Sequence, residues 1–109
     1  MKISNCFVYR VFNEKEFMNF KKTKKFEGNE LDIVSGFIHL STYEQIKGTI
    51  KKYFLENDNI LISKLRVSDL QASLKWEKNR DSEIFPHFYG TLKFKFILKT
   101  LKREDIHEF

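Results

Sequence analysis

Residues that cross-link or break a chain are scarce in this sequence. It contains one cysteine, one proline and four glycines in 109 residues. One cysteine cannot form an internal disulfide, and so little proline and glycine argues against a loop-rich or disordered chain. No apolar run approaches the roughly 20 residues that a membrane helix needs, and the N-terminus lacks the apolar stretch of a signal peptide. We therefore expect a cytoplasmic protein that does not associate with membranes.

Several common catalytic and metal-binding motifs are also missing. There is no cysteine pair, no pair of histidines four residues apart and no acidic cluster, so we expect no metal ion. The sequence has no Walker loop, no glycine fingerprint for a dinucleotide and no glycine-flanked serine nucleophile. A pocket for a ribose or a phosphate therefore fits the sequence better than a metal site or a serine hydrolase.

The composition is that of a folded and weakly basic protein. Hydrophobic residues make up 41% of the chain, and 12 of them are phenylalanine, which suits one domain over residues 1–109. Twenty lysines and arginines against 15 acidic residues give a net charge of +5. This excess favours an anionic partner such as a nucleotide or nucleic acid, although a lysine-rich genome produces the same balance without one.

The order of apolar patterns predicts an α+β protein with a mixed, mostly antiparallel sheet and two main helices. Strands are expected at residues 7–12, 37–40, 60–65, 74–77 and 92–101. The first of these is apolar on both faces except for Arg10. Pro86 interrupts an extended segment, residues 84–90, and predicts an edge strand or a shaped loop there, because proline cannot donate to a sheet.

The two helices are recognised by their first turns. Asn13 and Glu16 match a capping box for a helix over residues 13–20, and a second helix begins at Ser41 or Thr42, where Glu44 completes a similar box. In this second helix the apolar stripe of Ile46, Ile50, Tyr53 and Phe54 faces the core, and Gly48 indicates close packing against a neighbour.

A short strand followed by a helix, Gly36 to Thr42, is the most informative stretch of the sequence. Side chains alternate along a strand, so Phe37, His39 and Ser41 share one face. An imidazole and a hydroxyl are thus offered together beside a helix N-terminus, whose amides and dipole suit an anion. The alternative is structural: His39 is then a hydrogen-bonded core histidine and Ser41 only a cap.

Five further residues are candidates for a ribose or phosphate pocket. Arg10 can meet an anion, Glu77 can accept from a ribose hydroxyl, His87 can donate to the ligand, and Trp76 or Tyr89 can stack on a base. Each also has a structural reading: Arg10 at a strand end in solvent, Glu77 in a surface ion pair, and the aromatic residues in edge-strand packing. The lysine run over residues 21–25 can contact phosphates or simply end a helix in solvent.

Three blocks of the sequence resemble the signature blocks of the family called domain of unknown function 952. The blocks are Gly36 to Thr42, then Trp76-Glu77, then Phe85 to Gly90, and their order and spacing match as well. The opening Val8-Tyr9-Arg10 is similar to the first strand of the family, where Tyr-Lys is usual. The resemblance covers nearly the whole chain, and because the family is bacterial and biochemically uncharacterised, it implies little about function.

The segment Ile38 to Ser41 also resembles the His-Leu-Ser strand of the NAD-dependent RNA 2′-phosphotransferases. That resemblance implies an ADP-ribosyltransferase-like fold, with a split sheet gripping NAD and with His39 and Ser41 at the nucleotide. The histidine that those enzymes carry on their first strand is matched here by Arg10, and Glu77 is the candidate for the carboxylate of the wider fold. Both matches depart from the pattern of the enzymes.

We therefore expect a cleft that binds NAD, ADP-ribose or a similar ribose phosphate, with ADP-ribosyl or phosphate transfer as its chemistry. The expected catalytic residues are His39, Glu77 and Arg10. The expected ligand-binding residues are Ser41, Thr42, Trp76, His87 and Tyr89. The alternatives are a nucleotide-binding module without catalysis and an RNA-associated protein that uses the lysine run.

Overall fold

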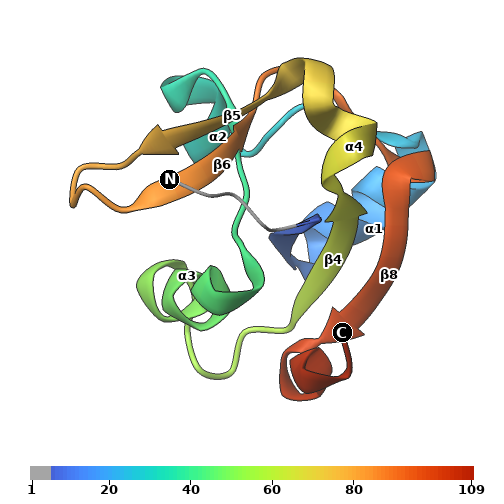
Figure 1. Cartoon of the computed structure of the whole chain (residues 1–109). Helices are drawn as coiled ribbons and strands as arrows, with labels where there is room; N and C mark the ends of the chain where they lie inside the picture. The colour runs from blue at the N-terminus through green and yellow to red at the C-terminus, as the bar shows by residue number, and fades with distance from the viewer. Residues whose placement is uncertain (1–5) are drawn as a thin grey trace.

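The computed structural model describes residues 6–109, whose strands form small antiparallel sheets rather than one continuous sheet (Figure 1). One sheet has the order β1 (Phe7–Asn13), β4 (Ile60–Arg66), β8 (Ile97–Lys102); a second has the order β3 (Ile38–His39), β6 (Ile84–Phe88), β5 (Leu74–Lys78); and β2 (Lys25–Phe26) pairs with β7 (Leu92–Lys93). Every one of these pairings is antiparallel. The predicted α+β class is confirmed.

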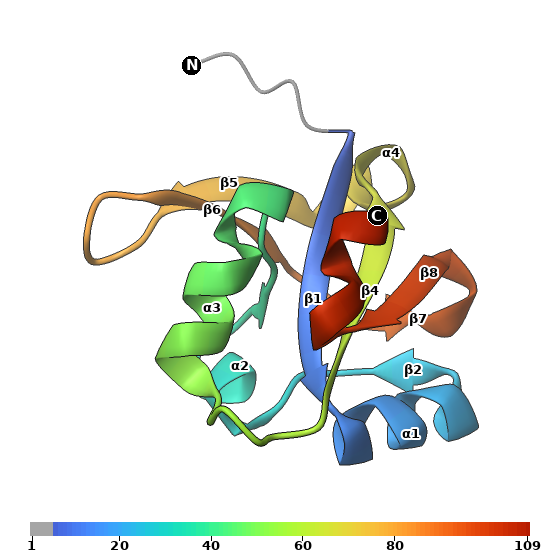
Figure 2. The same cartoon turned by 90° about the horizontal axis from the view of Figure 1, so that it is seen from below.

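Helices connect and cover these sheets. They are α1 (Glu14–Thr23), α2 (Glu30–Ser35), α3 (Ile46–Tyr53) and α4 (Val67–Leu70), with 3-10 turns η1 (Tyr43–Gln45), η2 (Gln71–Ser73), η3 (Phe94–Phe96) and η4 (Arg103–Glu108). Figure 2 shows α2, α3 and the β5–β6 hairpin on one side of β1 and β4, and α1, β2, β7 and β8 on the other. None of the helices in residues 6–109 is long and apolar enough to cross a membrane.

The start of each main helix is close to its predicted place. The capping box of Asn13 and Glu16 is present, with the Glu16 amide donating to Asn13 Oδ1 at 2.7 Å. At the second helix Thr42 is the cap of η1, but its box partner is Gln45 and not Glu44. The chain therefore makes a 3-10 turn before α3 begins, which shifts the predicted helix by a few residues.

The prediction of close packing at Gly48 is wrong. No heavy atom in the described part of the chain lies within 4 Å of the position that a Cβ of Gly48 would take. The stripe on this helix is also shorter than predicted, because Ile46 and Ile50 are buried whereas Tyr53 is half exposed and Phe54 lies past the helix end. One face of α3 is thus left open around Gly48.

The predicted extended segment contains strand β6 (Ile84–Phe88), which is central in its sheet, so the prediction of an edge is wrong. β6 lies between β3 and β5, and Pro86 is opposite Trp76. The carbonyl of Pro86 accepts from the Leu40 amide at 3.1 Å. In an antiparallel strand the amide and carbonyl of one residue point to the same side. The missing donor of Pro86 therefore faces β3 where that two-residue strand ends, and little pairing is lost.

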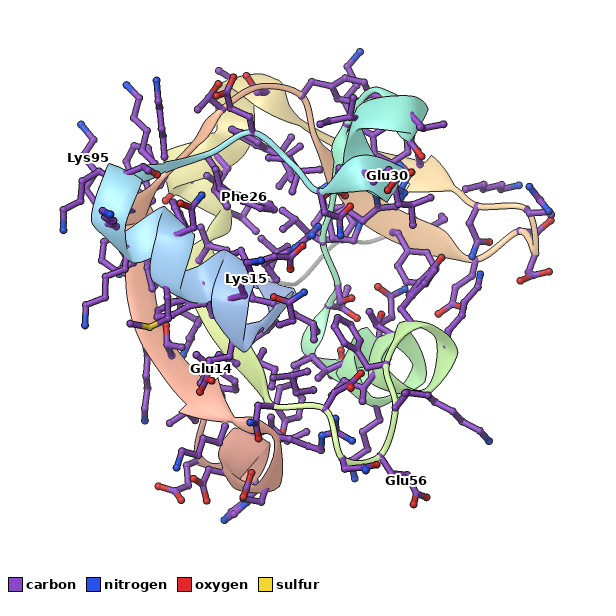
Figure 3. All side chains as sticks on the ribbon, turned by 180° about the vertical axis from the view of Figure 1, so that it is seen from behind. Glu14, Lys15, Phe26, Glu30, Glu56 and Lys95 are labelled. Carbon is purple, nitrogen blue, oxygen red and sulfur yellow. The ribbon has the colours of Figure 1, made fainter. Side chains whose placement is uncertain are left out.

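Two buried clusters share the faces of β1. Val8 and Phe12 belong to a phenylalanine-rich cluster with α1 and β7, and Tyr9 and Val11 belong to an aliphatic cluster with α3 and β4. Phe26 of the first cluster points into the interior (Figure 3). The first cluster also explains why the predicted strand over residues 92–101 is interrupted: Phe94 turns onto Phe17 and Phe20 in η3.

A single bridge joins β1 to the strand of the His39 stretch. The amide of Tyr9 donates to the Ser41 carbonyl and the amide of Ser41 to the Tyr9 carbonyl, both at 2.8 Å. This bridge fixes Arg10 of β1 next to His39 of β3. It therefore brings together residues that are 29 positions apart in the sequence.

Candidate functional site

A cleft of about 910 Å³ lies between α2, α3 and the β5–β6 hairpin. Its floor is formed by residues of β1, α2, β6 and the stretch Phe37 to Ser41 around β3. Its mouth is formed by exposed residues of α3 and of the loop that follows β5. The floor side chains are Arg10, Asp32, Phe37, His39, Ser41 and His87. Four of these six were predicted as site residues from the sequence; Asp32 and Phe37 were not.

Asp32 is the hub of the floor. Arg10 grips its carboxylate with two nitrogens, at 3.0 Å to Oδ1 and 2.9 Å to Oδ2, and the side chains are only 5% and 2% exposed. The amide of Asn29 donates to Oδ2 at 2.7 Å, and the amide of His39 donates to Oδ1 at 3.0 Å. Such a buried ion pair is stable only when its remaining hydrogen-bonding capacity is filled, as it is here for the carboxylate.

Local sequence explains how Asp32 reaches this position. Asn29 caps α2, and Asp32 is the third residue of that helix, so their side chains form a reciprocal capping box. Gly36 ends the helix in the left-handed conformation, at a φ of 87°, and turns the chain back over the helix start. The amide and the ring of His39 consequently meet the Asp32 carboxylate.

The Asp32 carboxylate is ionised in this setting. Burial by itself raises the pKa of Asp32, but the hydrogen bond from His39 and the charge and hydrogen bond of Arg10 outweigh it. The net result is a pKa far below the usual range. An ionised carboxylate only accepts hydrogen bonds, so the contact of 2.7 Å to His39 Nδ1 requires the proton to be on Nδ1.

His39 is fixed by this contact and faces the cleft. Its side chain is 31% exposed, and no residue of the described chain hydrogen-bonds to its Nε2. A ring whose Nδ1 is held by a carboxylate has a defined orientation and tautomer, and its Nε2 is available to a ligand. The structure thus places His39 in the cleft, and its catalytic role stays a prediction.

A second anchored histidine lies beside the first. His87 is directly opposite His39 in the β3–β6 pair, and its Nδ1 lies 2.7 Å from Glu77 Oε1. Tyr89 donates its hydroxyl to the same oxygen at 2.7 Å. Burial lowers the pKa of His87, against the opposing effect of Glu77, so the neutral ring is favoured. Its Nδ1 then donates to Glu77, and Nε2 carries a lone pair.

Phe37, the residue before β3, packs against the rings of both histidines. Its ring stacks on His87 at 3.9 Å between centroids and 22° between planes, and lies 4.6 Å from the ring of His39. The two imidazole centroids are 5.8 Å apart. Phe37 and the carboxylates therefore fix the distance and the angle between the histidines.

The other predicted site residues occupy less direct positions. Ser41 is buried at the cleft floor, and its Oγ lies 2.8 Å from Thr49 Oγ1 on α3. The hydroxyl is therefore already hydrogen-bonded within the protein. Thr42 caps η1 and does not line the cleft. Trp76 is on the opposite face of the sheet, packed against the phenylalanine-rich cluster. Arg10 is occupied by Asp32, and only its Nε is buried without a hydrogen-bond partner in residues 6–109.

Glu77 and Tyr89 also lie outside the cleft lining, behind His87. The site therefore has two layers: a pair of histidines at the cleft, and the carboxylates and the tyrosine that hold them. The sequence contained one signal for Asp32, which is that a buried arginine in β1 requires an acidic partner.

These features define an α+β protein with a two-histidine cleft. Comparison with known proteins identifies its family. Residues 11–100 match the family described as protein of unknown function (DUF952). The chain belongs to this family, as the three sequence blocks predicted. No curated protein is similar enough to count as a match.

Solved structures of one relative support the fold. The X-ray structure of protein CC0527 from Caulobacter crescentus has a TM-score of 0.82 and 31% identity, with 88% of this chain and 84% of that chain covered. The solution NMR structure of CC0527 has a TM-score of 0.79 and 31% identity, with 89% and 84% covered. Both are structures of the same protein, so they support the architecture and leave its function open.

Proposed function

We propose that the cleft binds a ribose-phosphate nucleotide of the NAD or ADP-ribose class. The observation that carries the proposal is the pair of imidazoles at the cleft, His39 and His87. Each is held through Nδ1 by a carboxylate, and no residue of the described chain hydrogen-bonds to either Nε2. Binding sites for small molecules measure about 300–1,000 Å³, so a cleft of about 910 Å³ is large enough for a dinucleotide.

Charges at the mouth suit the phosphates of such a ligand. Lys52, Lys78 and Arg80 line the cleft and are exposed. In the proposal these cations contact the diphosphate, while His39 on the floor favours a ribose hydroxyl or a phosphate oxygen. Arg10, which is paired with Asp32, acts by holding the Asp32 carboxylate that orients His39. Acidic residues also line the mouth, among them Glu44 and Glu83, so the ligand is held at specific cations and not by a uniformly positive surface.

The base is assigned to a different aromatic residue from the one predicted. Trp76 faces the core, whereas Tyr53 and Phe85 line the cleft. Tyr53 is 50% exposed, which leaves one side of its ring available for stacking. We therefore assign the base to the end of α3 or to the start of β6.

The second part of the proposal is that the cleft transfers an ADP-ribosyl or phosphate group. We also propose that the separate sheets surround the nucleotide as they do in the ADP-ribosyltransferase-like fold. The sequence predicted Glu77 as a catalytic residue that contacts the ribose directly. Because its Oε1 is bound to His87 and Tyr89, we propose that Glu77 acts through His87 instead, by fixing that ring. A binding module without catalysis would use the same cleft and give no product.

Calorimetric titration tests the proposal. ADP-ribose and NAD are titrated into the parent protein, into His39→Ala and into the matched control His107→Ala, whose side chain is 73% exposed in η4. We expect binding to the parent and to the control, with affinity at least about tenfold lower in His39→Ala, because a hydrogen bond to an ionised group contributes about 1.5–3 kcal/mol. Equal affinity in all three proteins, or no binding to the parent, refutes the proposal.

A second candidate function, association with RNA, is favoured by one feature of the fold. The β2–β7 pair places Lys25 opposite Lys93, so the lysine run over residues 21–25 is extended by Lys93 and Lys95 from a distant part of the chain. Figure 3 shows Lys95 close to the end of α1. If these lysines bind a single strand, the logarithm of the affinity falls with the logarithm of salt concentration by about 0.7 per phosphate contact. A salt-insensitive affinity, or none, counts against this function.

A further inference from the structure

His39 and His87 lie close enough to act on the same ligand group. They are cross-strand neighbours in β3 and β6, with ring centroids 5.8 Å apart and an angle of 65° between the ring planes. Both rings line the same cleft. Hydrogen bonds to a reacting atom span about 2.6–3.2 Å, so two rings at this spacing can contact two oxygens of one phosphate group.

We propose that this pair cleaves a ribose 3′-phosphodiester by transferring the phosphoryl group to the neighbouring 2′-hydroxyl. The substrate class is an RNA-type linkage, and the reaction needs no cofactor. The inference rests on the proposed binding of a ribose phosphate in the cleft and names the reaction that takes place there.

The two histidines supply both proton transfers. His87 is the base: its buried, neutral ring donates Nδ1–H to Glu77 and takes the proton of the 2′-hydroxyl on Nε2. O2′ then attacks phosphorus, the bond from phosphorus to O5′ breaks, and His39 in its protonated form gives its Nε2 proton to O5′. The products are a 2′,3′-cyclic phosphate and a free 5′-hydroxyl.

A second step restores both rings. A water molecule gives one proton to His39, attacks the cyclic phosphate, and the protonated His87 returns its proton to O2′. The product is a 3′-phosphate, and no electron is gained or lost in either step. Asp32 and Glu77 are positioning residues in this scheme, because each contacts a histidine and neither lines the path of the proton.

The proposal requires a bell-shaped dependence of the rate on pH. The charged and titratable groups that face the two rings are Asp32 and Arg10, next to His39, and Glu77, Lys75 and Tyr89, next to His87. The pKa values of both carboxyl groups are below their usual values and that of Tyr89 is above its usual value. Asp32, Glu77 and Tyr89 therefore keep their charges between about pH 5 and about pH 8, and the two limbs of the profile report on other groups.

Cleavage of a dinucleotide provides the test. The probe is uridylyl-adenosine with a chelator present, and the variants are His39→Ala, His87→Ala and the exposed control His107→Ala, all purified identically. General acid–base catalysis contributes about 10²–10⁴-fold, so we expect the parent and the control to cleave alike and each of the other variants to be at least about 100-fold slower. Each of these two variants also loses one limb of the pH profile.

A second variant keeps the test valid if His87→Ala fails to fold. Gly48→Phe adds a phenyl ring to the cleft lining from α3, where the Cβ itself would meet no other atom within 4 Å, and it changes neither histidine. It is expected to abolish cleavage in a folded protein. Parent-level cleavage by folded Gly48→Phe or by His39→Ala would overturn the inference.

Titration of the uncleavable 2′-deoxy form of the probe separates the two proposals. Binding of this analogue without cleavage of the ribose form overturns the catalytic inference and leaves the nucleotide site standing. An absence of both binding and cleavage overturns the catalytic inference, and the titration of ADP-ribose then decides separately whether the nucleotide site stands. Binding of the analogue with cleavage of the ribose form, lost in His39→Ala, supports both.

Discussion

Replacing Asp32 by asparagine is expected to be the most destabilising of the single polar changes in this site. The Asp32 side chain is 2% exposed and faces Arg10, whose side chain is 5% exposed. Asparagine is similar in size but carries no charge, so the Arg10 guanidinium would remain buried without a counter-charge. Removal of one partner from a buried ion pair costs about 3–5 kcal/mol. We expect the free energy of unfolding of Asp32→Asn to fall by that amount at neutral pH.

The effect has a defined pH dependence. The folded pKa of Asp32 is below its unfolded value, so its ionisation stabilises the fold fully above the unfolded pKa, about 3.9. This stabilisation is lost as the pH falls below that value toward the folded pKa. The difference between the parent and Asp32→Asn should therefore shrink in acid.

Urea unfolding from about pH 7 down to about pH 3, a range that spans the unfolded pKa of Asp32, measures this difference. The control is Glu30→Gln on the same helix, an exposed position where a change is expected within about 0.5 kcal/mol (Figure 3). An Asp32→Asn protein within about 1 kcal/mol of the parent at neutral pH, below the range for a broken buried pair, would refute the reasoning. A loss that stays constant down to acid pH would refute it as well.

Three further changes test neighbouring parts of the site. Tyr89→Phe removes a donor from Glu77, so the carboxylate attracts His87 more strongly and the pKa of His87 should rise, as NMR titration of the ring would show; a lower pKa contradicts this. Gly48→Ala should raise the free energy of unfolding by up to about 1 kcal/mol, because its Cβ meets open space in a helix. Thermal unfolding measures this change, and a lower melting temperature than that of the parent would contradict the prediction. Trp76→Phe should leave the affinity for ADP-ribose unchanged, since Trp76 faces the core; a calorimetric titration with a tenfold weaker affinity would disprove this placement.

Local patterns in the sequence predicted most of the elements. The caps at Asn13 and Thr42 and the strand β4 are encoded within a few residues, and the structure confirms them. The errors at Pro86 and Gly48 have a different origin. A central strand tolerates proline only because β3 ends beside it, and a helix glycine faces a cleft only because of distant packing, which no local pattern contains.

The candidate site shows the same division. The sequence indicated His39 and His87 as separate candidates, and the strand alternation placed His39 with Phe37 and Ser41 correctly. A buried arginine in β1 indicated that some acidic partner was needed, but not that it was Asp32, because the position of Asp32 depends on the turn at Gly36. Trp76 and Glu77 are adjacent in the sequence, yet alternation sends one to the core and the other to His87.

The tautomers of the two site histidines test the central claim most directly. Nitrogen NMR of labelled imidazoles, recorded above about pH 8 where an unperturbed histidine is neutral, reports which ring nitrogen carries the proton. If Asp32 and Glu77 hold the rings as described, both His39 and His87 carry the proton on Nδ1, and ADP-ribose shifts their Nε2 signals while those of exposed His107 stay in place. Protons on Nε2 in both rings, or shifts confined to other residues, would contradict the two-histidine cleft as the binding site.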